Sequence, residues 1–388
     1  MVVKDEALLI AQAIESVRHV VDEIVVVDTG STDDTREIAA RCGARVYAHA
    51  YDGNLGKARN AYMDLARGAW VLVLDGDEKI AQRDAATIRA LTEDIGSVAY
   101  RFIVHNYTRS LDLLCDWHPN SGTYQEEEAF SQCPGHSRFR VVRLFRRLPT
   151  VRYEEGYSGH TNPLRSLRAV GVAVRDADVV IHHFQCRKGG EGFVMRKQHE
   201  RLASEQKHLA LCPDDALAHL NVGRTLFALG QDAEALGHLD RAVDLDAHSE
   251  QARLSRAIVR YETGDYTGAV ADLDAAVSAA PTFADGWTVL GMAYHALDRR
   301  EAAADAFTAA LALRPQHPVA LNSFGVLLMD LGEGVRAEQY FRQALAVLPD
   351  HPTARANLET LLNGAALRSA DADDYTLVPE ISDEGHHV

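Results

Sequence analysis

The chain has 388 residues, of which 47% are hydrophobic, so two or three domains with buried cores are expected. Its formal net charge of −16 disfavours nucleic acid as the main partner, because phosphate binding requires a basic surface, although a bound metal ion can offset acidity around an anionic ligand. Five cysteines, no apolar run of membrane-spanning length and no signal-peptide core near the N-terminus together predict a cytoplasmic protein.

The first half of the chain alternates apolar strands with amphipathic helices. Helices are expected at residues 6–21, 31–42 and 54–67, and strands at residues 23–27, 44–47, 70–74, 98–104 and 140–145. The runs at 23–27 and 70–74 are almost wholly apolar, which is typical of strands covered on both faces of a parallel sheet. The pattern predicts a doubly wound α/β domain with a mostly parallel sheet.

Acidic turns follow two of these strands. Asp75, Gly76 and Asp77 come directly after the strand at 70–74, and Asp28 follows the strand at 23–27. Because open α/β sheets bind ligands at the carboxyl ends of their strands, we expect the two turns to meet there. Two carboxylates beside a glycine suit a hard divalent cation that carries phosphates, and Asp28 suits a ribose or a base. Together the turns predict a nucleotide and metal site.

Four motifs resemble the family 2 glycosyltransferases in order and spacing, and the resemblance covers roughly residues 1–190. They are Lys4-Asp5-Glu6, residues 25–33 (VVVDTGSTD), residues 57–60 (KARN) and residues 74–78 (LDGDE). The resemblance implies a GT-A fold, which is Rossmann-like, and a nucleotide-sugar donor that is usually UDP-linked. It also implies Mn²⁺ or Mg²⁺, held on the donor diphosphate by the acidic motif.

The resemblance also implies roles for single residues. Asp28 and the turn at residues 4–6 contact the nucleoside, Asp75 lies near the ribose, and Asp77 is the metal ligand. His183 matches a histidine that often completes the metal shell, and we prefer it to His182 because alternation along a strand sends the two to opposite faces. The donor-binding residues implied by position are Lys4, Asp5, Glu6, Asp28, Arg59, Asn60, Asp75 and Gly76.

The catalytic base is less well defined. Residues 143–146 and 159–160 resemble the second half of the same domain, in which a glutamate commonly follows the histidine. Thr161 follows His160 here, and a hydroxyl cannot act as the carboxylate base that an inverting transferase needs. We therefore place His160 in the catalytic region with three candidate bases: Glu155, which we take first, Glu154 and Asp116.

Two Cys-x-x-His pairs lie outside the resemblance, Cys115 with His118 and Cys133 with His136. Their spacing suits a structural Zn²⁺ that would order the intervening loop. The alternative is two free cysteines in a variable loop.

From residue 213 onward the chain repeats every 34 residues. Pro213, Ala247, Pro281, Pro315 and Pro349 keep this interval, as do Gly230, Gly264, Asp298 and Gly332. A period of 34 is the signature of tetratricopeptide repeats, which are helix pairs stacked into a solenoid. The resemblance covers residues 216–351. In the third repeat the small Ala303 allows close helix approach and Phe307 fills the gap between the paired helices.

The second repeat departs from this pattern at Arg253, Arg256 and Arg260, which stand where apolar residues are expected. Either these arginines lie along an exposed groove with their stems on apolar surface, or they form a patch that binds anions or peptides.

The predicted organisation is a GT-A domain at residues 1–190, a connecting helix at 191–213, an all-α repeat solenoid with a capping helix at 214–363, and a disordered acidic tail at 364–388.

These features predict a metal-dependent, inverting glycosyltransferase that moves a sugar from a UDP-sugar to a peptide or protein held by the repeats. One alternative is a non-catalytic scaffold with a decayed transferase domain, to which Thr161 points. Another is a transferase that acts on a small molecule or an envelope glycan, with the repeats forming a homodimer.

Overall fold

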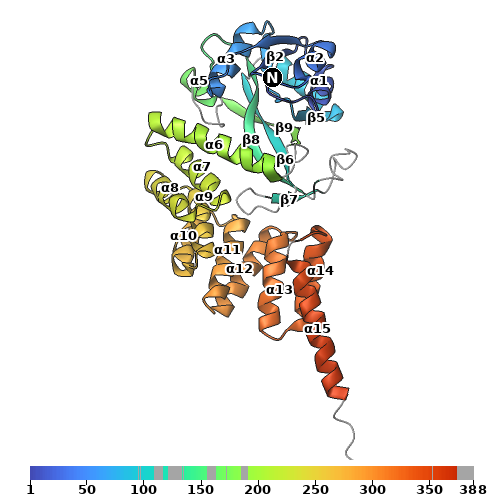
Figure 1. Ribbon diagram of the computed structural model, residues 1–388, viewed down its shortest axis with the longest axis vertical. Helices are drawn as coiled ribbons and strands as arrows, with labels where there is room; N and C mark the ends of the chain where they lie inside the picture. The colour runs from blue at the N-terminus through green and yellow to red at the C-terminus, as the bar shows by residue number, and fades with distance from the viewer. Residues whose placement is uncertain are drawn as a thin grey trace, which may run out of the picture. The chain divides into compact units, whose positions relative to one another are not determined.

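The computed structural model describes residues 1–94, 96, 98–108, 117–120, 133, 135–154, 163–171, 173–184, 191–351 and 353–373 (Figure 1). It divides into two compact units, Met1–Pro281 and Thr282–Val388. The division falls within the 34-residue repeats, so the first unit contains the α/β domain together with the first helix pairs.

A three-stranded parallel sheet begins the first unit, in the order β1-β2-β3. Its strands are β1 (Val2–Val3), β2 (Val25–Asp28) and β3 (Arg45–Ala48), connected through the helices α1 (Ile10–Val17) and α2 (Thr35–Arg41). Every residue of β2 is buried, as its apolar run predicts, and its last residue is Asp28. The predicted strand and helix alternation is therefore confirmed in this part of the chain.

A second sheet is mixed, in the order β4-β8-β6-β9-β5, with β7 paired to β8. Its strands are β4 (Trp70–Leu72), β5 (Glu78–Ile80), β6 (Ala99–Thr108), β7 (Trp117–Pro119), β8 (Gly135–Arg146) and β9 (Val174–His183). Among the described strands of this sheet, β6 and β9 pair in parallel and the other pairs are antiparallel. The expectation of a mostly parallel sheet is thus wrong here. An apolar run shows that a strand is buried, but it does not reveal the direction of its partner.

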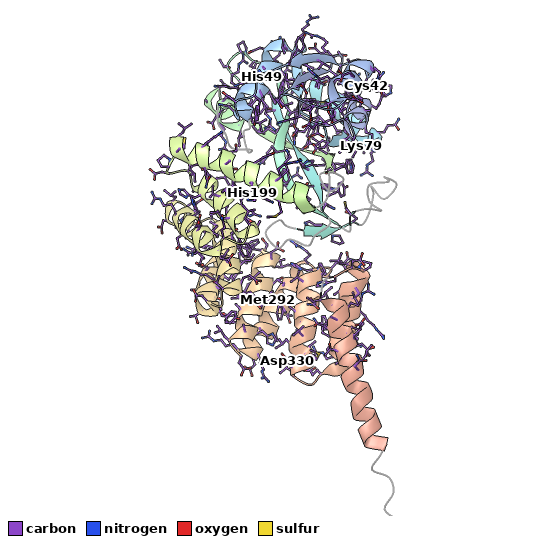
Figure 2. The ribbon with its side chains drawn as sticks, viewed as in Figure 1. Cys42, His49, Lys79, His199, Met292 and Asp330 are labelled. Carbon is purple, nitrogen blue, oxygen red and sulfur yellow. The ribbon has the colours of Figure 1, made fainter. Side chains whose placement is uncertain are left out.

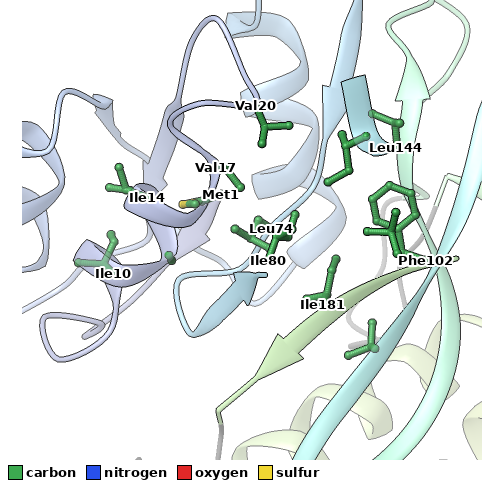
Figure 3. Packing of buried hydrophobic residues seen from close by; sticks show 14 of the residues in the cluster. Met1, Ile10, Ile14, Val17, Val20, Leu74, Ile80, Phe102, Leu144 and Ile181 are labelled. Atoms are coloured by element: carbon green, nitrogen blue, oxygen red, sulfur yellow. The ribbon is translucent and has the colours of Figure 1, made fainter. Parts of the chain in front are cut away.

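The residues on either side of the turn at residues 75–77, called the acidic turn below, are buried in the core of this domain. Leu74, just before the turn, and Ile80, just after it, are both fully buried. Figure 3 shows them between Ile10 of α1 and Phe102 of β6, members of the same cluster. The remaining helices of the domain are α3 (Leu55–Leu65), the 3-10 helix η1 (Gln82–Asp84), α4 (Ala85–Glu93) and α5 (Leu164–Ala169).

Helices α6 to α15 follow in the described residues from 191 onward. The first unit contains α6 (Glu191–Leu211), α7 (Ala216–Ala228), α8 (Asp232–Leu245), α9 (Glu250–Glu262) and α10 (Tyr266–Ala279). The second contains α11 (Ala284–Ala296), α12 (Arg300–Leu313), α13 (Pro318–Asp330), α14 (Gly334–Val347) and α15 (Ala354–Asp373). A Cβ on Gly291 would lie 2.7 Å from the ring of Phe307, so the glycine lets the paired helices approach closely. The helix pairs predicted from the 34-residue period are confirmed.

The arginines of the second repeat have partners within the helical repeats. Arg256 Nε donates to Asp272 Oδ2 at 2.8 Å and Arg260 Nη1 donates to the same oxygen at 2.9 Å. Arg253 donates to the carbonyl oxygen of Ala247 at 2.9 Å. The alternative of an exposed groove is therefore wrong for Arg256 and Arg260, whose side chains are 13% and 24% exposed and pair with Asp272 of α10 and Asp240 of α8. The alternative of a patch that binds anions or peptides stays a prediction.

Replacing Asp272 by asparagine should destabilise the first unit by about 3 kcal/mol, because Asp272 is buried and its loss leaves two arginines short of countercharge. Urea unfolding measured by circular dichroism provides the test. Asp240→Asn is the matched control, since the side chain of Asp240 is 51% exposed and its pair with Arg256 should contribute less than about 1 kcal/mol. Equal effects of the two changes would contradict the prediction.

Each helix pair turns through a left-handed residue. Gly230, Gly264 and Gly332 have φ of 73°, 86° and 77°, and Asp298 occupies the equivalent position with φ of 55°. A side chain in this conformation costs about 1 kcal/mol, which glycine avoids.

Asp298→Gly should therefore stabilise the second unit by about 1 kcal/mol, less the small loss of its exposed pair with Arg300. The reverse change at the matching turn, Gly332→Asp, should destabilise it by a similar amount. The thermal unfolding midpoint of the full chain measures both changes, and a fall in the midpoint for Asp298→Gly would show the argument to be wrong.

Candidate functional site

Two loops at the carboxyl ends of β1 and β2 are joined by hydrogen bonds. The backbone N–H of Asp5 donates to Ser31 Oγ at 2.9 Å, and that of Glu6 donates to Thr35 Oγ1 at 2.7 Å. In return Asp5 Oδ1 accepts from the N–H of Thr32 at 2.7 Å. The segments at residues 4–6 and 28–35 therefore form one surface, which includes the two features predicted to contact the nucleoside, Asp28 and the turn at residues 4–6.

Asp28 is buried at the base of this surface. Its Oδ1 accepts from the backbone N–H groups of Gly30 and Ser31, each at 3.2 Å, and its Oδ2 accepts from the Ser31 hydroxyl. Gly30 has φ of +102°, a conformation that favours glycine, which allows the chain to fold back over the carboxylate. Asp28 thus orders the loop that follows β2.

The acidic turn lies against the first of these loops. A Cβ on Gly76 would lie 2.9 Å from Cγ of Glu6 and 3.1 Å from Cγ1 of Val3, so the turn approaches β1 as closely as glycine permits. Three segments distant in sequence, which follow β1, β2 and β4, are thereby joined. The expectation that the turns after β2 and β4 meet at the edge of one sheet is wrong, because the two strands lie in different sheets and the loop at residues 4–6 connects the turns.

Asp77, just before β5, and His183, at the end of β9, face one another beside the acidic turn. The distance from His183 Nε2 to Asp77 Oδ2 is 3.0 Å, and the N–H of Phe184 donates to the carbonyl oxygen of Asp77 at 3.0 Å. The register of β5 and β9 produces this approach, because Glu78 lies opposite His183 and Lys79 opposite His182. Figure 2 labels Lys79 on β5, the edge strand of the sheet.

Alternation along β9 separates the two neighbouring histidines. His183 reaches Asp77, whereas His182 is fully buried and its Nδ1 lies 2.8 Å from the hydroxyl of Tyr107. Burial opposes protonation of His183, but the charge and hydrogen bond of Asp77 outweigh it and raise the pKa of His183 to about 9.

Two arginines flank Asp75. Arg59 Nη2 and Arg143 Nη1 each lie 3.7 Å from Asp75 Oδ2. Burial favours the neutral acid, but the charges of Arg59 and then Arg143 outweigh burial and lower the pKa of Asp75. For Glu78, burial outweighs the charge of Arg143 and the pKa is raised.

Asn60 and Arg59 extend the site along α3. Asn60 exchanges two hydrogen bonds with the backbone of Tyr153, at 3.0 and 2.9 Å, and the guanidinium of Arg59 lies 5.4 Å from the centre of the Tyr153 ring. The contact with Tyr153 was missed from the sequence, which carries no signal for a pairing across more than 90 residues.

Other predicted site residues are exposed or lie outside the described residues. Lys4 and Glu154 are exposed. The candidate catalytic residues Glu155 and His160, and the alternative base Asp116, lie outside the described residues, as does Cys115.

The histidines of the proposed zinc site pair across β7 and β8, with the ring centres of His118 and His136 6.0 Å apart. Cys133 is disulfide-bonded, and a sulfur in a disulfide is not the thiolate that zinc requires. The structure therefore does not support the zinc prediction for Cys115, His118, Cys133 and His136, of which Cys115 lies outside the described residues. Within the described ranges, no group of three histidine, cysteine or acidic side chains is arranged to hold a metal ion.

Family models match both halves of the chain. Residues 1–148 match the model described as Glycosyl transferase family 2. Residues 200–250, 254–318 and 319–352 match models described as Tetratricopeptide repeat. Residues 1–148 are thus similar to family 2 glycosyltransferases and residues 200–352 to tetratricopeptide repeats, in the predicted order.

Individual proteins are similar over shorter stretches. A TPR repeat-containing protein of Synechococcus elongatus is 31% identical over 157 residues, 40% of this chain and 33% of that protein. An uncharacterized glycosyltransferase of Rickettsia felis is 38% identical over 111 residues, 29% of this chain and 35% of that protein. The crystal structure of MamA is 22% identical with a TM-score of 0.36, covering 42% of this chain and 96% of that one. The chain spans about a third of the length of the two curated relatives.

Among the helices of the described residues, none combines the length and the apolar character that a membrane crossing requires.

Histidine rings gather on the strands beside the site. The ring centres of His105 and His136 lie 3.9 Å apart, and Asn120 Oδ1 lies 2.9 Å from His136 Nδ1. Burial, with Arg138 and His118 nearby, lowers the pKa of His105 to about 4. Burial, with the neighbouring histidines and Arg138, lowers the pKa of His136 to about 3.

The stability of the first unit should therefore fall as the pH is lowered from about 6.5 towards 4. The unfolded chain takes up protons on these histidines below its pKa of about 6.5, whereas the folded chain binds them only near the lowered values, so acid favours unfolding. Urea unfolding at pH 7, 5.5 and 4.5 should show a smaller loss of stability for His136→Gln than for the unaltered chain. The same loss in both proteins would contradict this account.

Proposed function

We propose that this chain is a metal-dependent, inverting glycosyltransferase that transfers a sugar from a UDP-sugar to a peptide or protein acceptor. The observation that carries the proposal is the contact between the loops that follow β1, β2 and β4, together with the approach of His183 to Asp77. These segments and the end of β9 carry Asp28, Asp75, Asp77 and His183. The match of residues 1–148 to the family 2 model supports the same reaction class.

The side chains of Asp77 and His183 fit a divalent cation. Asp77 Oδ2 and His183 Nε2 lie 3.0 Å apart and share a hydrogen bond, so an oxygen and a nitrogen ligand stand side by side for a cation that displaces the histidine proton. Mn²⁺ accepts this mixture of donors, and Mg²⁺ is commonly held by one or two carboxylates together with substrate phosphates and water. We assign Asp77 and His183 as the metal ligands, with the donor diphosphate completing the shell. When bound, the cation offsets the charge that develops on the departing diphosphate.

Other residues of the chain would bind the donor and deprotonate the acceptor. The surface formed by residues 4–6 and 28–35 holds the nucleoside, and Asp75 lies beside it for the ribose. Arg59 adds a cation next to Asp75 that favours an anionic donor. Glu155 is the proposed base for the acceptor proton, with His160 in the same region, and both assignments rest on the sequence.

The acceptor is proposed from the repeats. Tetratricopeptide solenoids present extended concave surfaces on which peptides bind, and fusion to the transferase domain raises the effective concentration of a bound acceptor. An acceptor of another kind, such as a small molecule or an envelope glycan, would leave the repeats to bind a second copy of the chain.

The test is a screen of UDP-sugars for Mn²⁺-dependent donor hydrolysis, with UDP binding followed by thermal shift. Asp77→Asn should lower metal-dependent turnover by about 100-fold, because it removes the charge of a metal ligand. Asp64→Asn is the matched control, since Asp64 is exposed and paired with Arg152 away from the acidic turn, and it should leave turnover unchanged.

Two outcomes would count against the proposal. No turnover and no UDP-induced shift for the unaltered chain with any UDP-sugar would leave the non-catalytic scaffold as the better account. Full activity of Asp77→Asn would refute the metal assignment.

A further inference from the structure

A buried arginine supports the acidic turn from the neighbouring strand. Arg143 lies in β8 with 7% of its surface exposed, and its Nη2 donates to Glu78 Oε1 at 2.6 Å. Its Nη1 lies 3.7 Å from Asp75 Oδ2. The backbone of Arg143 accepts a hydrogen bond from the N–H of Val73 at 2.7 Å, so this guanidinium is anchored beside the strand that leads into the turn.

Glu78, the partner of Arg143, is hydrogen-bonded to the acidic turn at two places. Its Oε2 accepts from the backbone N–H of Asp75 at 2.9 Å, and its own N–H donates to the carbonyl oxygen of Asp75 at 3.1 Å. Residues 75–78 are therefore closed by a side chain as well as by the main chain. Arg143 fixes the side chain that closes them.

Stability alone does not explain a charged pair at this position. Burying two ions costs desolvation energy that their attraction often only offsets, so an apolar pair of similar volume would hold the sheet as well or better. What the guanidinium adds is geometry, because its planar fork fixes the direction of the hydrogen bond to Glu78. It also adds a positive charge beside the carboxylates of Asp75 and Glu78.

We propose that Arg143 is a positioning residue for the donor site, which through Glu78 and Asp75 holds the acidic turn in the geometry where Asp77 faces His183. The inference rests on the proposed function, because it assigns Arg143 to the site that takes a nucleoside diphosphate and a divalent cation. Arg143 acts through these carboxylates and is not itself a catalytic residue.

The test is the double variant Arg143→Met with Glu78→Gln, which removes both charges but keeps an amide oxygen to accept from the Asp75 N–H. Because no buried charge is left alone, its thermal unfolding midpoint should stay close to that of the unaltered chain. Its affinity for UDP in the presence of Mn²⁺, measured by calorimetry, should fall by about 10- to 100-fold, as for other residues that orient metal ligands.

Arg140→Met is the matched control. Arg140 lies on the same strand, but its Nη1 donates to the carbonyl oxygen of Ala177 at 3.2 Å, away from the turn. This variant should bind UDP and Mn²⁺ as the unaltered chain does. Arg143→Lys, which keeps the charge and loses the fork, should fold normally and bind about tenfold more weakly, and it decides the question if the double variant does not fold.

The results distinguish failure of the positioning role of Arg143 from failure of the proposed function. If the unaltered chain binds UDP with Mn²⁺ and both Arg143 variants bind equally well, the positioning role is refuted while the proposed function stands. If the unaltered chain shows no Mn²⁺-dependent binding of UDP, the proposed function fails and the inference fails with it.

Discussion

The close contact of Gly76 with the loop after β1 is the constraint on which the rest of the site depends. Glu6 and Val3 occupy the space that a side chain at position 76 would need, so the acidic turn can lie directly against the first loop. That loop is in turn hydrogen-bonded to the segment after Asp28. A single small residue thereby lets three chain segments share one surface, while buried Leu74 and Ile80 keep the turn from moving away.

Glycines also allow close packing between the paired helices of the repeats. Gly325 faces the ring of Phe341, as Gly291 faces Phe307, and in both pairs the missing side chain sets the distance between helices. In the second repeat Ala257 stands at the corresponding position, and the pairing of α9 with α10 is completed by Arg256 and Asp272. Close backbone approach thus depends on small residues in both halves of the chain. The ion pairs then fix how the side chains of the packed segments are oriented.

Much of the candidate site was predictable because its residues are adjacent in sequence to recognisable strands. Asp28, Asp75 and Asp77 each end or follow an apolar run, and ligand-binding residues gather at the carboxyl ends of strands, although β2 and β4 proved to lie in different sheets. The choice of His183 over His182 followed from alternation along β9, and the structure places His183 against Asp77. Arg143 was not assigned a role, because its partner Glu78 lies 65 residues away and no local pattern reports a pairing between distant strands.

The sequence by itself determined the order of the two parts, the 34-residue period, the strands that end in carboxylates and the glycines that turn the helix pairs, since all of these are local patterns. Only the tertiary structure decided that β4 pairs antiparallel with β8, that Arg256 and Arg260 are bound to Asp272, and that Arg143 supports the acidic turn. The physical reason is that propensity and periodicity act over a few residues, whereas strand partners and buried charges are selected by contacts that form when distant segments meet.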